Sequence, residues 1–317
     1  MEQRRVGLSG LQVSRMGLGT MMWGRDTDEH EARDQLVDFL DAGGTYLDTA
    51  STYGGGASEE LIGTLLRGDV DRADLVLCTK GGITRRDGGR VVDASRRALL
   101  AALDASLCKL GTDHVDLFLV HAWDPDVPLS EVLSTLEYAV TSGRARYVGV
   151  SNYNGWQLAR AATLAGSGPG ALVTDQVEFS LLARGAETDV LPAAQAVGVG
   201  AIGWSPLGRG VLTGKYRHGT PADSRAASEH FAGYVRPYLG ARQRRIVEAV
   251  CTAATGLEAT PLEVALAWAR DRPGIASVVV GARTASQLRA AISADDLELP
   301  TAIRQALDDV SLPEAPC

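Results

Sequence analysis

Several features that would place this chain in a familiar class are scarce or missing. Its apolar runs fall far short of the roughly 18 residues needed to span a membrane, and MEQRRVGLSG at the start lacks the apolar segment of a signal peptide. The five histidines form no HExxH pattern, so we expect no metal site. The four cysteines are scattered without metal-type spacing, which indicates reduced thiols in a cytoplasmic protein; they are Cys78, Cys108, Cys251 and Cys317.

Charge of one sign is not concentrated in any segment. The net charge is −8 with acids and bases interspersed, so we expect neither a nucleic acid nor a membrane as partner.

Motifs for other chemistries are incomplete. GVSNY (149–153) resembles a GxSxG nucleophile motif but ends in Tyr153. GRGVLTGKY has the wrong glycine spacing for a P-loop and places Tyr216 where Ser or Thr should bind magnesium.

What the sequence does contain is a regular alternation of apolar runs and helix-like segments. MGLGT, TYLDT, LVLCTK, VDLFLV, RYVGVS, LVTDQVE, VGAIGW and ASVVVG are eight short apolar runs. Most are spaced by about 30 residues, the size of one βα unit. Helical periodicity appears between them, for example in residues 31–42, 94–110, 129–140, 241–256 and 261–271.

This alternation predicts an α/β fold, a (β/α)8 TIM barrel of eight parallel strands covered by helices. Residues 4–15 read as an N-terminal β-hairpin turning at Ser9 and Gly10. A long polar insertion follows the seventh strand, and no linker divides the chain. We therefore expect one domain over residues 1–317.

Chemistry in such barrels is found at the carboxyl ends of the strands. Polar or aromatic residues stand at or just beyond these ends in several runs: Asp48, Tyr53, Lys80, His121, Ser151, Asn152, Gln176, Glu178, Trp204 and Ser205. Taken singly, each has a structural explanation, such as a helix cap or a solvated charge. Together at one mouth, they favour a catalytic site.

Four of these residues suit one reaction. A tyrosine holds its proton at neutral pH, and a nearby lysine ammonium stabilises the phenolate that forms when the proton leaves. A carboxylate paired with the lysine holds that charge in place, and a histidine orients a substrate oxygen. The set of Asp48, Tyr53, Lys80 and His121 therefore suits proton donation to an oxygen that gains negative charge.

The order of motifs resembles the aldo-keto reductases, in the branch that includes bacterial general reductases and potassium-channel β-subunits. DTASTYG, LCTKGG, LFLVHAWDP, GVSNY, GWSPLGRGVLTGKY and GARTASQL occur in this order along nearly the whole chain. The resemblance implies reduction of an aldehyde or ketone to an alcohol. In it Tyr53 is the general acid, Lys80 lowers its pKa, Asp48 anchors Lys80 and His121 orients the substrate.

The resemblance also implies a nicotinamide coenzyme bound without a Rossmann domain, and no GxGxxG follows a strand here. Ser151, Asn152 and Gln176 are expected to bond its carboxamide, and Trp204 to stack on its ring. A loop after the seventh strand, at about 213–233, is expected to cover it. Its binding residues are carried over by position: Gly19, Thr20, Met21, Asp48, Ser151, Asn152, Gln176, Trp204, Ser205, Pro206, Leu207, Gly208, Arg209, Gly210, Lys215, Gly281, Arg283 and Gln287.

Arg283 favours NADPH over NADH, because a guanidinium binds a 2′-phosphate bidentately. The chain departs from the family pattern nearby. Thr284 replaces a second arginine, and Ala290 and Ala291 replace the Glu-Asn pair that grips adenine. We therefore expect weaker adenine recognition than is usual in the family.

Residues that follow the first, second and fourth barrel strands predict an apolar, aromatic-walled substrate pocket made by Met21, Met22, Trp23, Tyr53, His121 and Trp123. Such walls suit aryl aldehydes, ketones or sugars, including a nucleotide-linked keto sugar. Two other functions stay open. One is an NADPH-binding regulatory or sensor subunit with slow turnover, and the other is a barrel that uses Lys80 as a Schiff base. The sequence does not determine the oligomeric state.

Overall fold

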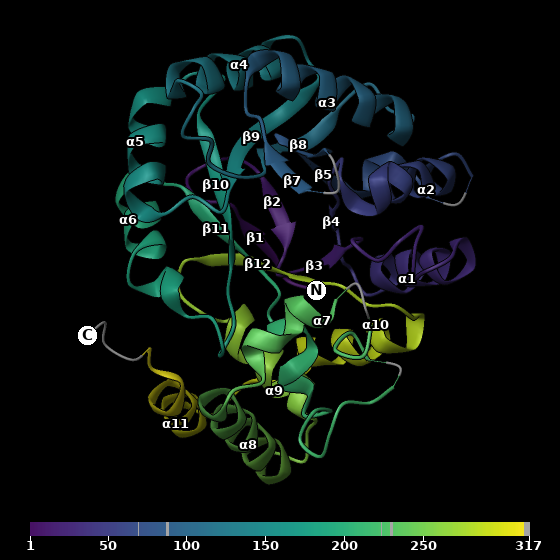
Figure 1. Ribbon diagram of the computed structural model, residues 1–317, viewed down its shortest axis with the longest axis vertical. Helices are drawn as coiled ribbons and strands as arrows, with labels where there is room; N and C mark the ends of the chain where they lie inside the picture. The colour runs from purple at the N-terminus through teal and green to yellow at the C-terminus, as the bar shows by residue number, and fades with distance from the viewer. Residues whose placement is uncertain (69, 87–88, 223, 229–230, 314–317) are drawn as a thin grey trace.

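The eight apolar runs form one closed parallel barrel, as Figure 1 shows. The computed structural model describes residues 1–317 except 69, 87–88, 223, 229–230 and 314–317, so Cys317 lies outside the described residues. Each strand pairs with the next in chain order, which confirms the predicted (β/α)8 barrel. The strands are β3 (Met16–Gly19), β4 (Tyr46–Asp48), β5 (Val76–Gly81), β8 (Val115–Val120), β9 (Ala145–Ser151), β10 (Leu172–Glu178), β11 (Gly200–Trp204) and β12 (Ile275–Val280).

Helices surround the barrel (Figure 1): α1 (Glu29–Asp41), α2 (Ala57–Leu66), α3 (Arg96–Leu110), α4 (Leu129–Thr141), α5 (Gly155–Ala165), α6 (Val190–Val197), α7 (Ala232–Val235), α8 (Ala241–Gly256), α9 (Pro261–Arg270), α10 (Ala285–Ile292) and α11 (Thr301–Ser311). Local signals fix their starts. Asp28 caps α1 by accepting from the Glu31 amide, and Thr260 forms a capping box with Glu263 at α9. Within the described residues, no helix is both long and apolar enough to cross a membrane.

The predicted N-terminal hairpin closes one end of the barrel. Strands β1 (Gln3–Arg5) and β2 (Gln12–Ser14) pair antiparallel, and Figure 1 shows them within the ring of strands. Val6 and Val13 pack with Tyr46, the first residue of β4. Gly7 lies so close to Gly200, the first residue of β11, that a Cβ would overlap it. The hairpin therefore seals the end where strands begin and leaves their carboxyl ends as the open mouth.

A second hairpin, β6 (Ile83–Arg86) and β7 (Gly89–Val92), follows β5 and was not expected from the sequence. After β11 the chain runs through three short helical elements, η4 (Gly208–Thr213), α7 and η5 (Arg236–Tyr238), before α8 begins. The polar insertion therefore lies between η4 and α7.

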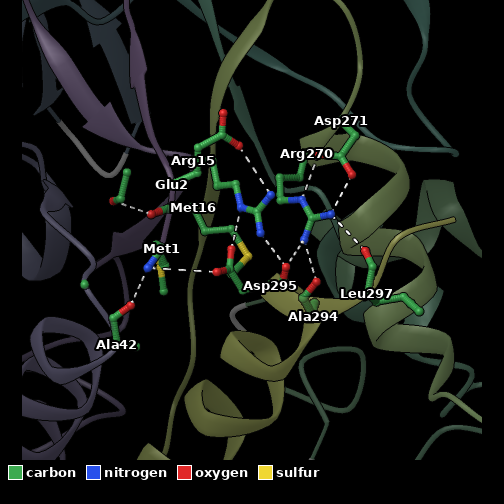
Figure 2. Close-up of polar contacts among 12 residues, drawn as sticks. Met1, Glu2, Arg15, Met16, Ala42, Arg270, Asp271, Ala294, Asp295 and Leu297 are labelled. Carbon is green, nitrogen blue, oxygen red and sulfur yellow. Dashed lines mark hydrogen bonds and ion pairs between the residues drawn. The ribbon is translucent and has the colours of Figure 1, made fainter.

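A buried arginine ties the last helices to the N-terminal segment (Figure 2). Arg270 is fully buried, and its guanidinium donates to the carbonyl oxygens of Ala294, Asp295 and Leu297 at 2.5, 3.0 and 2.9 Å. Arg15 Nε donates to the Asp295 carboxylate at 2.6 Å. Because these carbonyls lie in and just after η6 (Ser293–Asp296), the network fixes the path from α10 to α11.

Candidate functional site

A buried ion pair lies at the carboxyl ends of β4 and β5. Lys80 Nζ donates to Asp48 Oδ2 at 2.7 Å and to the Thr49 carbonyl at 2.8 Å, and Lys80 is fully buried. Asp48 Oδ1 accepts from Gln176 Nε2 at 2.6 Å and from the Tyr46 hydroxyl at 3.2 Å. Both carboxylate oxygens are therefore hydrogen-bonded, as a charge buried in a barrel requires.

The ion pair holds a fixed positive charge. Burial is the largest single effect and lowers the pKa of Lys80, but the charges of Asp48, Tyr53 and Cys78 and the hydrogen bond to Asp48 together raise it by more, so that the net pKa is raised. Lys80 thus stays an ammonium at neutral pH. A Schiff base needs a free amine, so this environment disfavours the Schiff-base alternative.

Tyr53 and His121 lie next to this charge. Lys80 Nζ is 5.2 Å from the centroid of the Tyr53 ring. The rings of Tyr53 and His121 meet edge to face, with centroids 6.2 Å apart and planes at 76°. Tyr53 begins the turn η1 (Tyr53–Gly56), in which Gly54 and Gly55 both have positive φ, a conformation that suits glycine. This turn projects the phenol from the end of β4 back toward β5.

The pKa of Tyr53 is raised to about 12, which differs from the expected lowering. Burial is the larger effect and raises the pKa, while the Lys80 charge lowers it and the Asp48 charge raises it. Lys80 acts in the expected direction but does not outweigh burial. Tyr53 is therefore protonated across the neutral range.

His121 is neutral. Burial lowers its pKa to about 3, helped by the charges of Lys80 and Arg90. Its Nδ1 is buried without a hydrogen-bond partner among the described residues. The tautomer with the proton on Nε2 leaves only an acceptor unpaired, which is the less costly state. Nε2–H is then the donor that His121 offers.

The side chains at the ends of β9 and β11 are bonded to one another through Asn152. Asn152 Nδ2 donates to Ser151 Oγ at 2.9 Å and to the His121 carbonyl at 3.0 Å. Asn152 Oδ1 accepts from Trp204 Nε1 at 3.0 Å. Asn152 and Ser205 have φ of 60° and 59°. Such strain in non-glycine residues is typical of functional sites, and one of these residues, Asn152, holds the Trp204 indole through its hydrogen bond.

These residues enclose a cavity of about 210 Å³, which we call the inner chamber. It is lined by Gly19, Met21, Met22, Asp48, Tyr53, His121, Ser151, Asn152, Gln176, Trp204, Ser205, Arg225, Tyr234, Val279 and Gly281. The structure therefore brings together three of the four predicted catalytic residues at the chamber surface. The fourth, Lys80, lies beneath them.

A second cavity of about 250 Å³, the outer chamber, adjoins the first. Ser205, Arg225, Val279 and Gly281 line both chambers. The outer chamber also gathers most of the remaining cofactor residues predicted from the sequence: Pro206, Leu207, Arg209, Gly210, Lys215, Arg283 and Gln287. The two chambers together form an extended cleft across the mouth.

The charges of the outer chamber fit an anion. Arg225 has no hydrogen-bond or ion-pair partner among the described residues. Burial lowers the pKa of its guanidinium, and the charge of Arg283 lowers it further. Lys215 and Arg283 line the same chamber. Burying a cation without a counter-ion is costly, so Arg225, with the charges of Lys215 and Arg283 in the same chamber, fits a phosphate-bearing ligand.

Arg209 differs from Arg225 in having an ion-pair partner. It lines the outer chamber, but its guanidinium forms a bidentate ion pair with Glu178 at 3.0 and 3.1 Å. Glu178 therefore already balances the charge of Arg209. The expectation that Arg209 binds a pyrophosphate stays a prediction.

Some predicted residues line neither chamber. Trp23 is fully buried in the core and donates to Gln35 Oε1 at 3.0 Å, which corrects its expected place in the pocket wall. Trp123 packs edge-on against Tyr153 and Trp156, 5.1 and 5.4 Å away, and among the described residues is not part of the cavity lining.

Two further predicted residues lie behind the cavity surface. The hydroxyl of Thr20 donates to the Asp48 carbonyl at 3.0 Å, so it supports the strand end rather than facing the chambers. Gly208 is buried with a φ of +53°, and an added Cβ would overlap Leu182. Its role is to let η4 begin close to the barrel.

Among the lining residues that sequence reasoning missed, two carry polar groups on long side chains, Arg225 and Tyr234. Both come from the segment between η4 and η5, which the sequence showed only as a polar insertion. A lone arginine and a lone tyrosine in an aperiodic loop give no sign of the direction in which they point.

The departures near the outer chamber have local explanations. Thr284 caps α10 by accepting from the Gln287 amide. Ala291 is buried and lines the outer chamber, whereas Ala290 is exposed. The expectation of weaker adenine recognition stays a prediction.

Comparison with known proteins agrees with this geometry. Residues 15–311 match the model of the Aldo/keto reductase family, and the chain belongs to that family. It is 36% identical over 320 residues to "Uncharacterized oxidoreductase YrpG" of Bacillus subtilis, covering 98% of this chain and 96% of that protein. Relatives named as oxidoreductases indicate an oxidoreductase.

Two other relatives have more specific names. The "L-glyceraldehyde 3-phosphate reductase" of Escherichia coli K12 is 34% identical over 304 residues, with 93% of this chain and 87% of that protein covered. A "Probable voltage-gated potassium channel subunit beta" of Arabidopsis thaliana is 33% identical over 308 residues, with 94% of this chain and 92% of that protein covered.

In the described part of the chain, no group of three or more His, Cys, Asp or Glu side chains is placed to hold a metal.

Proposed function

We propose that this protein is an NADPH-dependent reductase that converts an aldehyde or ketone to an alcohol. The observation that carries the proposal is the buried Lys80–Asp48 pair, 2.7 Å apart, beneath Tyr53 and His121 at the inner chamber. The adjoining outer chamber, where Arg225 has no hydrogen-bond or ion-pair partner among the described residues, supplies a place for phosphates.

The cofactor residues are proposed from the cavity lining and the family resemblance. Trp204, Ser151, Asn152 and Gln176 would hold the nicotinamide end in the inner chamber, together with Gly19, Met21 and Asp48. Ser205, Pro206, Leu207, Gly210, Lys215 and Gly281 would contact the phosphates, with Arg283 and Gln287 at the adenosine ribose. Bound NADPH supplies the hydride, which no side chain can provide.

The proton comes from Tyr53 in this proposal. Because its pKa is about 12, the phenol keeps its proton at neutral pH until negative charge develops on the substrate oxygen. The Lys80 charge then lowers the free energy of the phenolate, and Asp48 holds Lys80 in place. His121 Nε2–H donates a hydrogen bond that orients the same oxygen.

The test is a titration followed by turnover. Trp204 fluorescence should be quenched by micromolar NADPH and much less by equal NADH. Steady-state oxidation of NADPH should then be measured with aryl aldehydes, ketones, keto sugars and L-glyceraldehyde 3-phosphate. Rapid turnover with at least one carbonyl supports the proposal, and absence of binding by either nucleotide rejects it.

A second candidate is a nucleotide-binding regulatory subunit. The observation that favours it is the name of the plant relative, a probable potassium channel β-subunit. Tight NADPH binding with only slow, single-turnover oxidation by every carbonyl tested would favour this candidate over the reductase.

A further inference from the structure

Four side chains join the end of β10 to the segment that covers the mouth. Glu178 ends β10, Arg209 lies in η4, Tyr234 in α7 and Tyr238 in η5. Glu178 accepts from Arg209 and from the Tyr238 hydroxyl, the latter at 2.7 Å. Arg209 Nη1 donates to the Tyr234 carbonyl at 2.6 Å. These contacts tie two loop elements to a barrel strand.

The Arg209 guanidinium is also sandwiched among rings. Its Cζ is 3.5 Å from the centroid of Tyr234 and 4.7 Å from that of Tyr238. The side chains of Arg209 and Glu178 are only 13% and 24% exposed, so water screens their attraction little. A planar, bidentate and stacked guanidinium fixes orientation as well as charge. Arg209 is thus suited to setting the position of Tyr234.

Tyr234 itself reaches the inner chamber. It is one of the lining residues, and its hydroxyl has no hydrogen-bond partner among the described residues. Short α7 has no side-chain cap at its N-terminus, so its position depends on tertiary contacts such as that of Arg209. With one ring face covered by the guanidinium, the free phenol is the polar group that Tyr234 offers to a ligand.

We propose that Tyr234 contacts the substrate and determines its specificity, favouring carbonyl compounds that carry a hydroxyl group near the carbonyl. Arg209 and Glu178 are positioning residues that act through Tyr234, and Arg209 is not a phosphate ligand. The substrate preference assigned to Tyr234 rests on the proposed carbonyl reduction. The positioning role of Arg209 rests on the geometry alone.

The first test compares two aldehydes with the same three-carbon chain, glyceraldehyde and propanal. Tyr234→Phe keeps the ring and removes the hydroxyl. It should lower kcat/KM for glyceraldehyde by about 3- to 10-fold, the effect of one lost hydrogen bond, and change that for propanal less than about twofold. Tyr138→Phe, at an exposed position of α4, is the control. An equal effect on both aldehydes, or none, would overturn the role of Tyr234.

The second test needs no turnover. NADPH dissociation constants are measured by calorimetry for Arg209→Met, Arg209→Lys and Glu178→Gln, with thermal unfolding as the folding control. A positioning role predicts changes of less than about threefold in every variant. If Arg209 were a phosphate ligand, Arg209→Met would weaken NADPH binding about tenfold or more. Glu178→Gln would then tighten it by freeing the guanidinium, and the inference would fail.

The variants of the second test should also change the substrate preference measured in the first. Arg209→Met and Glu178→Gln should each abolish the preference for glyceraldehyde over propanal, and the double variant should be no worse than either alone, because both act through one side chain. Arg209→Lys should not rescue, because an ammonium neither stacks nor pairs bidentately; full rescue would overturn the positioning role. Lack of turnover in the unmodified protein would reject the proposed function, while the NADPH constants would still decide the role of Arg209.

Discussion

The ammonium of Lys80 lies 2.7 Å from Asp48 Oδ2, and both side chains are buried at the ends of adjacent strands. The pair maintains a positive charge next to a phenol whose pKa is about 12. The stabilisation it provides is therefore greatest when Tyr53 loses its proton, which is where a general acid needs it.

Tyr53→Phe should lower kcat for carbonyl reduction by about 10²- to 10⁴-fold, the usual contribution of a positioned acid. NADPH binding should be nearly unchanged, because the ring remains. Tyr153→Phe, a buried tyrosine that packs on Trp123, is the matched control. Steady-state kinetics and a fluorescence titration measure the two effects. A parallel loss of binding would show that the role of Tyr53 is wrongly assigned, and Lys80→Met should reduce kcat as severely.

The two arginines of the outer chamber should affect the two nucleotides differently. Arg225 lines both chambers, whereas Arg283 lines only the outer one. Arg283→Met should therefore weaken NADPH binding by about tenfold or more with little effect on NADH, through loss of a charge-assisted bond to the 2′-phosphate. Arg225→Met should weaken both.

Calorimetric dissociation constants for both nucleotides provide the measurement. Arg217→Met, which removes an ion pair with Glu248 at a partly exposed position, is the control. Equal losses of NADPH and NADH in Arg283→Met would contradict its assignment to the 2′-phosphate.

Restoring a carboxylate on α10 should improve nucleotide binding. Ala290 is exposed, so Ala290→Glu introduces no steric conflict. It should lower the dissociation constant of NADPH by about 3- to 10-fold if one hydrogen bond to adenine is regained. Ala290→Gln tests whether charge is needed. An unchanged constant in both variants would mean that adenine does not lie near this helix.

His121 should make the protein less stable in acid. Its folded pKa is about 3, below the unfolded value near 6.5. Between these values the unfolded chain binds a proton that the folded chain does not. The free energy of unfolding therefore falls as pH decreases from about 6.5 toward 3, with a slope of up to about 1.4 kcal/mol per pH unit.

His121→Asn should lack this contribution. Denaturant melts from pH 7 to 4 would compare the two proteins, because other groups titrate equally in both. Parallel stability curves would show that folding does not lower the pKa of His121.

Arg270→Met should destabilise the fold without changing the site. The buried guanidinium holds three carbonyls between α10 and α11 (Figure 2). Its removal leaves these carbonyls and the Asp271 carboxylate, its ion-pair partner, without the guanidinium, at a cost of about 3–5 kcal/mol in unfolding free energy. Arg97→Met, at an exposed position of α3, should cost far less. Urea melts measure the difference, and kcat of the folded enzyme should be unchanged.

Part of this site follows from the sequence because parallel strands share an edge. Asp48 and Lys80 each fall at the end of an apolar run, and alternation with helices makes those runs parallel neighbours. His121 follows the next run, so the same rule places it at the mouth. The strand pattern thus determines the barrel, the open end and these catalytic candidates.

Loops do not follow this rule. Adjacent Met22 and Trp23 were both expected in the pocket wall, yet Met22 lines the inner chamber and Trp23 is buried against Gln35. The unpredicted β6–β7 hairpin is another case. Neighbouring loop residues point in different directions, and loop sequences have no periodic pattern that indicates which residue faces the cavity.

The sequence by itself determined the barrel and the chemical character of its mouth, because hydrophobic periodicity and strand ends are local properties. Only the tertiary structure decided where Arg209, Arg225 and Tyr234 lie. The Arg209–Glu178 pair joins residues 31 positions apart, and nothing in the sequence indicates that Arg209 pairs with a strand-end carboxylate. Such pairings depend on the path of the covering segment, which long-range contacts determine.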